Sequence, residues 1–240
     1  MGRPEKKRGT AWPTTVLTII LILSTAVMIY LSNINAIAFD QHFYEDEYKK
    51  LNIYDRFSNT TDIDNETAFL ISYLESGEGT IQSDFYNEKE RIHMVEVRDL
   101  FRKVKIILDI AVILSAISAI LLIMSVQRYA SSLDNIKDYL KTTISNILIG
   151  IGAAVDGIAV LLGILSISFT SSFIHFHRLL FRTDTWMLNP ATDNLVRMLP
   201  EQFFFDIFMR IVLTSVIFAT ILLAVGFLIK LGKPTFMKSK

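Results

Sequence analysis

The sequence contains no cysteine. This absence excludes disulfide bridges, thiolate metal ligands and a cysteine nucleophile. Three signatures of well-known enzyme classes are missing as well, namely the nucleophile elbow G-x-S-x-G, the phosphate-binding P-loop and the zinc motif H-E-x-x-H. Serine hydrolase, nucleotide-binding and metallopeptidase chemistry are therefore not indicated.

Charged residues are scarce. They make up 20% of the 240 residues, whereas 51% of the residues are hydrophobic; soluble domains carry about 25% charged residues. The 24 basic and 24 acidic residues balance, which argues against nucleic acid as a partner. The apolar residues gather in four long runs, each long enough for the roughly 20 residues that a bilayer crossing needs. The sequence thus predicts a membrane protein.

The four runs predict an all-α polytopic fold, with one four-helix transmembrane domain over residues 1–240. No segment outside the runs is long enough to build a sizeable core of its own. The first run exceeds the roughly 7–15 apolar residues of a signal peptide, so we expect an uncleaved span. The expected spans are 14–38, 106–126, 147–173 and 207–229, and the expected outer loops are 39–105 and 174–206.

The distribution of lysine and arginine predicts the orientation. The N-terminal tail, the 127–145 loop and the C-terminal tail together hold 11 of the 24 basic residues, and basic segments stay in the cytoplasm. Residues 35–101 carry 15 acidic and 6 basic residues. We therefore expect both termini inside and both long loops outside.

Both outer loops are predicted to be structured. In the first, Asn65 is a plausible N-cap of a short helix that ends at Gly77, and Thr80 to Ser83 indicate a short extended piece. Asn87 with Glu90 three residues later forms a capping-box pattern, and the helix it starts could continue into the second span. The second loop is rich in aromatic residues and is expected to lie in or near the membrane interface.

All four histidines fall in the outer loops, and histidine titrates near physiological pH. His93 has Glu90 and Glu96 three residues away on either side, and either carboxylate could orient the imidazole of a general base. An ordinary surface histidine fits this spacing equally well. His175 and His177 would face one way on a strand, as a metal site requires, and would diverge on a helix.

Two charged residues fall inside predicted spans. Asp156 lies in the third span and Arg210 in the fourth, and intramembrane charges are candidates for function. The alternatives are structural: Arg210 could pair with Asp206 four residues earlier, and Asp156 sits among glycines that allow close helix packing.

Two stretches resemble a known family. One runs from Glu90 to Phe101 and contains His93 and Glu96; the other runs from Phe176 to Phe181 and continues with Trp186, Asn189-Pro190, Leu195 and Pro200-Glu201. With four spans in this order, the chain resembles the bacterial integral-membrane family that includes lipoprotein intramolecular transacylase, Lit. At Glu96 the chain has a longer side chain than the aspartate of the family pattern.

The resemblance implies an acyl shift within a lipoprotein at the outer leaflet. The sn-2 acyl chain of the diacylglyceryl group would move to the α-amine of the N-terminal cysteine, giving the lyso-form lipoprotein. It implies His93 and His177 as catalytic residues, with support from Glu90, Glu96, Trp186 and Arg210. The carboxylates near His93 make it the first choice for the base, and His177 is then the partner that stabilises the oxyanion or returns a proton. It implies no cofactor and no metal, and membrane lipids as partners. The main alternative is a non-enzymatic sensor or scaffold that binds a partner through its outer loops.

Overall fold

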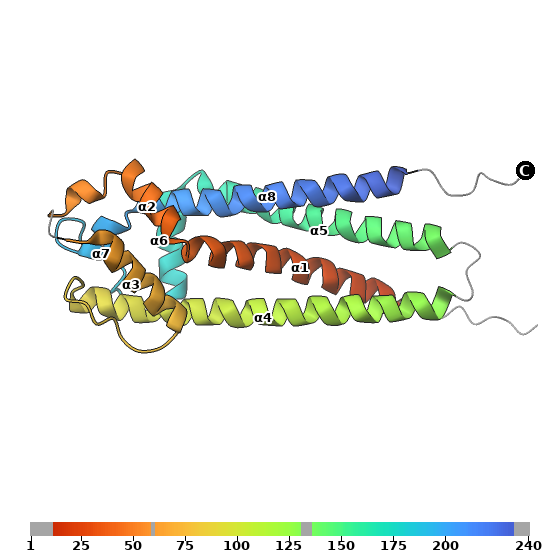
Figure 1. Cartoon of the computed structure of the whole chain (residues 1–240), viewed down its shortest axis with the longest axis horizontal. Helices are drawn as coiled ribbons and strands as arrows, with labels where there is room; N and C mark the ends of the chain where they lie inside the picture. The colour runs from red at the N-terminus through yellow and green to blue at the C-terminus, as the bar shows by residue number, and fades with distance from the viewer. Residues whose placement is uncertain (1–11, 59–60, 131–135, 233–240) are drawn as a thin grey trace, which may run out of the picture. The chain divides into compact units, whose positions relative to one another are not determined.

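The computed structural model describes residues 12–58, 61–130 and 136–232 of the chain, and in these ranges every regular element is a helix. Figure 1 labels the α-helices in chain order. They are α1 (Trp12–Ala38), α2 (Gln41–Lys50), the 3-10 helix η1 (Tyr54–Arg56), α3 (Ile63–Ser76), α4 (Glu88–Ala130), α5 (Ile136–Ser166), α6 (Phe169–Leu180), α7 (Asn194–Met198) and α8 (Glu201–Leu231). The predicted all-α fold is confirmed.

Four helices, α1, α4, α5 and α8, are long and apolar enough to cross a membrane. Large apolar side chains such as Ile120, Ile164 and Leu228 are exposed on them, as expected for surfaces that face lipid. Helix α4 has 43 residues, or about 65 Å at 1.5 Å per residue, whereas the hydrocarbon core is about 30 Å thick. The segment 88–105, which is rich in charged residues, precedes the apolar stretch of α4. The first turns of α4 therefore lie outside its membrane-spanning part.

The described chain divides into two compact units, and glycines pack the helices of the first. This unit comprises 12–28, the described parts of 110–155, and 218–232. A Cβ on Gly152 would lie 2.9 Å from the carbonyl oxygen of Ala219, and one on Gly150 would overlap Ile22. Glycine thus permits α5 to approach α8 and α1. Gly157 has open space around it, so its role in packing is not supported.

The second unit, Ile29–Asp109 with Asp156–Ile217, contains an aromatic core. Phe203 of α8 is buried against three rings of α2, with ring centroids 5.8 Å from Phe43, 5.0 Å from Tyr44 and 6.2 Å from Tyr48. Ring pairs at such separations are favourable beyond their buried area. This core confirms the prediction that the first outer loop is folded.

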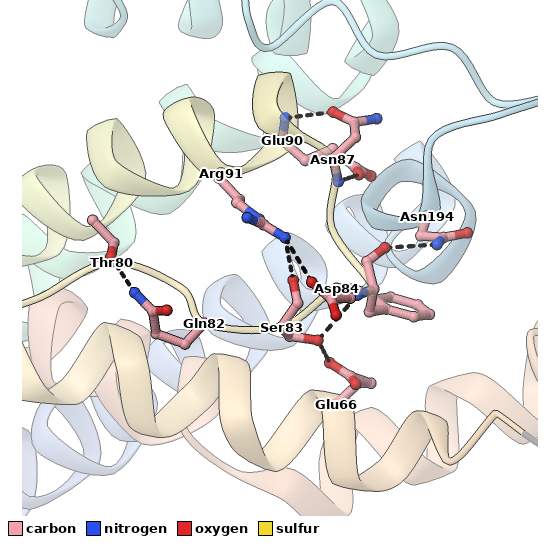
Figure 2. A network of polar contacts seen from close by, with 10 residues as sticks. Glu66, Thr80, Gln82, Ser83, Asp84, Asn87, Glu90, Arg91 and Asn194 are labelled. Atoms are coloured by element: carbon pink, nitrogen blue, oxygen red, sulfur yellow. Dashed lines mark hydrogen bonds and ion pairs between the residues drawn. The ribbon is translucent and has the colours of Figure 1, made fainter.

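The capping box that the sequence predicts at the start of α4 is present. The backbone N–H of Asn87 donates to the Glu90 carboxylate at 2.7 Å, and the backbone N–H of Glu90 donates to the Asn87 side chain at 3.0 Å (Figure 2). Two of the backbone amides at the start of the helix thereby find a partner. Helix α4 runs without a break from this cap to Ala130, as predicted.

One local expectation for the first outer loop is wrong, and the expected extended piece forms no strand. Helix α3 is capped by Asp62, whose carboxylate accepts from the backbone N–H of Asn65 at 3.0 Å, so Asn65 is not the cap. Gly77 does end the helix, in the left-handed conformation that favours glycine. The segment 80–83 is not a strand. It has side-chain anchors instead: Ser83 donates to Glu66 and its carbonyl accepts from Arg91 (Figure 2).

The third apolar run is divided between two helices. Helix α5 ends at Ser166 and α6 begins at Phe169, so the expected span 147–173 is not one helix. The hydroxyl of Ser166 donates to the carbonyl of Gly163 at 2.7 Å, and that of Ser172 to the carbonyl of Leu165 at 2.9 Å. Hydroxyls that bond nearby carbonyls offer the backbone an alternative to the helix. These serines thus cap α5 rather than mediate helix packing.

Helix α6 bridges the start of α8 and the outer turns of α4. At its first turn, Phe169 lies 5.2 Å from Phe205 of α8; just beyond its last residue, Phe181 lies 4.8 Å from the ring of His93 of α4. Within the second unit, α6 accordingly runs across the direction of these two helices (Figure 1). Its remaining face exposes Phe176 and Leu179, which fits the expected position near the membrane interface.

Candidate active site

Two histidines meet where α6 reaches α4. His93 and His177 are 84 positions apart in the sequence, yet their ring centroids lie 6.1 Å apart with the ring planes inclined at 32°. Both side chains are buried, with 6% and 8% of their surface exposed. Buried polar groups of this kind rarely occur without a structural or chemical reason.

Aromatic rings surround this pair. Trp186 lies 5.1 Å and Phe173 4.2 Å from the ring of His177, and Phe181 contacts both histidines, at 4.8 Å from His93 and 5.3 Å from His177. Among these rings, Phe173 carried no signal in the sequence beyond its place in an apolar run. The rings remove water from both imidazoles, which disfavours their charged forms.

The histidines are consequently held neutral. Burial, and next the neighbouring His177, lower the pKa of His93 to about 4, while the charge of Glu96 acts in the opposite direction. Burial also lowers the pKa of His177, and the hydrogen bond to Phe173 offsets part of this effect. His93 lies ahead of the apolar stretch of α4 and His177 beyond the end of α5, so both titrate outside the membrane-spanning segments.

One of the two imidazoles has a defined tautomer. Nδ1 of His177 lies 2.7 Å from the carbonyl oxygen of Phe173, and because a carbonyl only accepts, Nδ1 carries the hydrogen. The lone pair of the neutral ring is then on Nε2. Nδ1 of His93 is buried without a hydrogen-bond partner. His177 therefore has the arrangement of a general base, with Nε2 free to accept a proton. Nδ1 of His93 remains available for a hydrogen bond to a ligand.

Neither neighbouring carboxylate hydrogen-bonds to His93, contrary to the expectation from spacing. Glu96 accepts from Thr183 at 2.9 Å, from Thr185 at 3.1 Å and from the backbone N–H of Arg182 at 3.3 Å. These donors come from a segment 86 to 89 residues away, and nothing in the sequence indicated them. Glu96 affects His93 only through its charge.

Glu90 likewise binds backbone rather than imidazole. It is almost fully buried, accepts from Asn87, and also accepts from the backbone N–H of Leu195 at the start of α7. Burial raises the pKa of Glu90, and the backbone donors act in the opposite direction. Asn87 also donates to Asp193 at 3.1 Å. Glu90 thus fixes α7 to α4.

Of the remaining supporting residues, Trp186 is at the site and Arg210 is not among its contacts. Arg210 lies over the ring of Phe43 at 5.5 Å, a cation–π arrangement. Asp206, its expected partner, instead pairs with Lys50 of α2 at 2.9 Å. Because the tertiary fold supplies closer partners, the pair expected from i,i+4 spacing does not form.

The other two histidines are exposed and have their own contacts. His42 lies 3.7 Å from Glu45, and Nδ1 of His175 lies 2.7 Å from the carbonyl oxygen of Ser171. His175 and His177 diverge because both are on a helix. In the part of the chain that the structure describes, no group of three or more side chains is placed to hold a metal ion.

Two further features of the structure are separate from the histidine pair. A cavity of about 790 Å³ opens on the other side of α6, lined by Ile174, His175 and Arg178 together with residues of the α5–α6 connection and the start of α8. Asp156 of α5 has one carboxylate oxygen that is buried without a hydrogen-bond partner. Neither feature involves His93 or His177.

Comparison with solved structures identifies proteins of the same fold. The structure of the membrane-integral lipoprotein intramolecular transacylase Lit from Bacillus cereus matches with a TM-score of 0.76 and 22% identity, over 92% of this chain and 97% of that one. Two variants of that protein, with one histidine replaced by arginine or by alanine, match with a TM-score of 0.72 and 23% identity, over 92% of this chain and 93% and 94% of theirs. At this identity the likeness shows the fold.

Sequence comparison adds the family. No curated protein matches the chain. The family model described as lipoprotein intramolecular transacylase Lit matches residues 18–204, a range that contains both buried histidines and three of the four supporting residues, Glu90, Glu96 and Trp186. The chain therefore belongs to the lipoprotein intramolecular transacylase family, Lit, and is a membrane-bound acyltransferase.

Proposed function

We propose that the acyl shift of this family takes place at His93 and His177. The free α-amine of a diacylglyceryl-modified cysteine attacks the carbonyl carbon of the sn-2 ester on the same molecule. A carbon–nitrogen bond forms, the ester carbon–oxygen bond breaks, and one proton passes from the nitrogen to the glycerol oxygen. The observation that carries the proposal is the convergence of two buried, neutral imidazoles on one point.

We assign the base to His177, although the spacing of Glu90 and Glu96 favoured His93. Nδ1 of His177 is committed to Phe173, so its Nε2 accepts the proton that the attacking amine loses. The same nitrogen then returns this proton to the departing glycerol oxygen, so His177 ends the cycle unchanged. An α-amine has a pKa of about 7.7–8.0, so a histidine can take its proton once the nitrogen has begun to bond.

His93 stabilises the negative charge that develops on the carbonyl oxygen. A ring held neutral by burial carries one N–H, and a preorganised N–H donor in a site without water stabilises an oxyanion strongly. A fully charged imidazolium would instead cost desolvation in this apolar setting. The pair thus divides the chemistry between a proton carrier and a neutral donor.

The remaining barrier is mainly entropic. The cyclic intermediate contains the amine nitrogen, two cysteine carbons, sulfur, two glycerol carbons, the ester oxygen and the carbonyl carbon. Folding the substrate into this eight-membered ring fixes several rotors, and a pocket that holds the ring geometry removes much of the cost. Because the nucleophile belongs to the substrate, the enzyme needs none of its own, consistent with the absence of cysteine. Trp186 and Phe181 provide the walls; Arg210 we assign to the packing of α8 on α2.

We further propose that both termini are cytoplasmic and that the site opens at the outer leaflet of a bacterial plasma membrane. The support is the excess of lysine and arginine in the tails and the 127–145 loop. Alkaline phosphatase, active only outside, is expected to be inactive when fused after Lys240, and a green fluorescent protein fusion there is expected to fluoresce. The opposite pair of results would contradict the orientation.

The decisive test is expression in a bacterium that makes only diacylglyceryl lipoproteins with a free amine. Substrate and product are isomers, so their intact masses are equal. Tandem mass spectrometry of the N-terminal peptide is expected to place one acyl chain on the cysteine nitrogen, and mild alkali is expected to release one fatty acid instead of two. A scaffold that binds a partner through its outer loops would leave the amine free in the presence of the protein.

A further inference from the structure

The segment between α6 and α7, residues 181–193, covers the histidine pair; we call it the strap. Phe181 at its start contacts both imidazoles, and Trp186 in its middle lies 5.1 Å from His177. The rings of the strap thus contribute directly to the burial of the two histidines.

Polar contacts hold the strap on the outer turns of α4. Glu96 accepts three hydrogen bonds from its first part, from Arg182, Thr183 and Thr185. The ammonium of Lys89 donates to the backbone carbonyl of Met187. Positions 89, 93 and 96 of a helix lie on one face, so His93 is located between the two attachments.

The two ends of the strap are fixed differently. At the end near α7, Asp193 is buried, accepts from Asn87, and is followed by Leu195, which is held by the buried Glu90. The attachments of the first half of the strap, Thr183 to Glu96 and Met187 to Lys89, involve the exposed residues Thr183, Met187 and Lys89. Solvent can replace hydrogen bonds in such exposed positions at little net cost. The end near Glu96 is therefore the one able to open.

The substrate cannot reach the site with the strap in place. A base must come within about 3 Å of the proton that it takes, yet only 6% of His93 and 8% of His177 is exposed. The diacylglyceryl group carries two acyl chains and a polypeptide. Some part of the covering must move away before the reaction and return afterwards.

We propose that Glu96 is a positioning residue that latches the strap over the bound lipid, with Trp186 against His177. The inference rests on the proposed acyl shift and assigns Glu96 a task within it. The strap releases from Glu96 and Lys89 to admit the diacylglyceryl group, and then closes again. Closure excludes water, which would otherwise attack the same ester carbonyl and release a free fatty acid in place of the amide.

Tethering the strap tests whether it must move. The chain has no cysteine, so the double variant Lys89→Cys with Met187→Cys carries the only thiols. Joining them with a disulfide-containing bis-maleimide is expected to lower the transfer rate at least tenfold, and cleavage of the linker by a reductant is expected to restore it. The matched control is Met187→Cys alone treated with the same reagent; it is expected to remain active, because only the backbone carbonyl of Met187 takes part in the contact with Lys89. Full activity of the tethered protein would overturn the proposal.

Substitution of the latch tests its role in excluding water. Glu96→Ala is expected to raise the ratio of free fatty acid to transferred acyl chain several-fold and to accelerate hydrogen exchange of the backbone amides of 182–187. Glu96→Gln retains an acceptor for the threonine hydroxyls and is expected to lie between Glu96→Ala and the wild type. Glu88→Ala is the control, because Glu88 is exposed on the same helix and its side chain forms no hydrogen bond with any residue in the described ranges.

These readouts separate the two ideas. If Glu96→Ala leaves both the ratio of free fatty acid to transferred acyl chain and the rate of amide exchange at the wild-type values, Glu96 does not latch the strap. This test does not depend on the cysteine pair, so it holds even if the double cysteine variant is inactive before tethering. Absence of the lyso-form from the wild-type protein would instead contradict the proposed function, and the exchange measurement would still report whether Glu96 holds the strap.

Discussion

Replacement of His177 by alanine is expected to abolish formation of the lyso-form lipoprotein. If His177 carries the proton from the amine to the glycerol oxygen, its loss removes general base catalysis, which typically contributes about 10²- to 10⁴-fold in rate. No other imidazole in the described site has Nδ1 bound to a carbonyl and Nε2 available, because Nδ1 of His93 lacks a partner. Tandem mass spectrometry of the lipoprotein N-terminus over a time course measures the loss.

His175→Ala is the matched control for this experiment. His175 lies on the same helix two positions earlier, it too bonds a backbone carbonyl, and it is exposed rather than buried. We expect His175→Ala to retain most of the activity and both variants to accumulate in the membrane. An inactive His175→Ala together with an active His177→Ala would reject the assignment.

Replacement of His93 by alanine is the second large effect that we expect. Removing one donor from an oxyanion site typically costs about 10²- to 10³-fold in rate. His93→Gln keeps an N–H near the same place, so it is expected to lose less activity than His93→Ala. His177→Gln, by contrast, has no basic nitrogen and is expected to be as impaired as His177→Ala. The four variants are compared by their initial rates of acyl transfer.

The comparison of glutamine variants decides between the two roles. An active His177→Gln with an inactive His93→Gln would reverse the assignment and make His93 the base. His42→Ala is the control for loss of an outer histidine, since His42 is exposed and, among the described residues, its side chain contacts only Glu45 of its own helix. We expect this variant to transfer acyl chains at the wild-type rate.

Local patterns determined much of the fold in advance. The apolar runs predicted four long helices, because the cost of burying an unpaired backbone group in lipid leaves a membrane segment little alternative to a helix. Asn87 and Glu90 predicted the start of α4, since a capping box involves only neighbouring residues. The end of α5 at Ser166 was missed, because the run of apolar residues continues through the break and serine hydroxyls terminate the helix within it.

The candidate site, too, was only partly predictable from the sequence. The residue types in the two outer motifs were sufficient to single out His93 and His177, but the choice of partners for each polar group was not local. Glu96 and Glu90 could both reach His93 by spacing. In the fold, both accept instead from the second outer loop: Glu96 accepts from the hydroxyl of Thr183, and Glu90 from the backbone N–H of Leu195. Asp206 similarly takes Lys50 in place of Arg210.

The sequence by itself therefore determined the membrane class, the number of long apolar helices and the identity of the two candidate histidines. Only the tertiary structure decided that these histidines lie 6.1 Å apart, that aromatic rings keep them neutral, and that His177 rather than His93 has a fixed tautomer. The physical reason is how far along the chain the interacting residues are from one another. Hydropathy and capping depend on a few consecutive residues, whereas desolvation and hydrogen-bond choice depend on which distant segments the fold brings into contact.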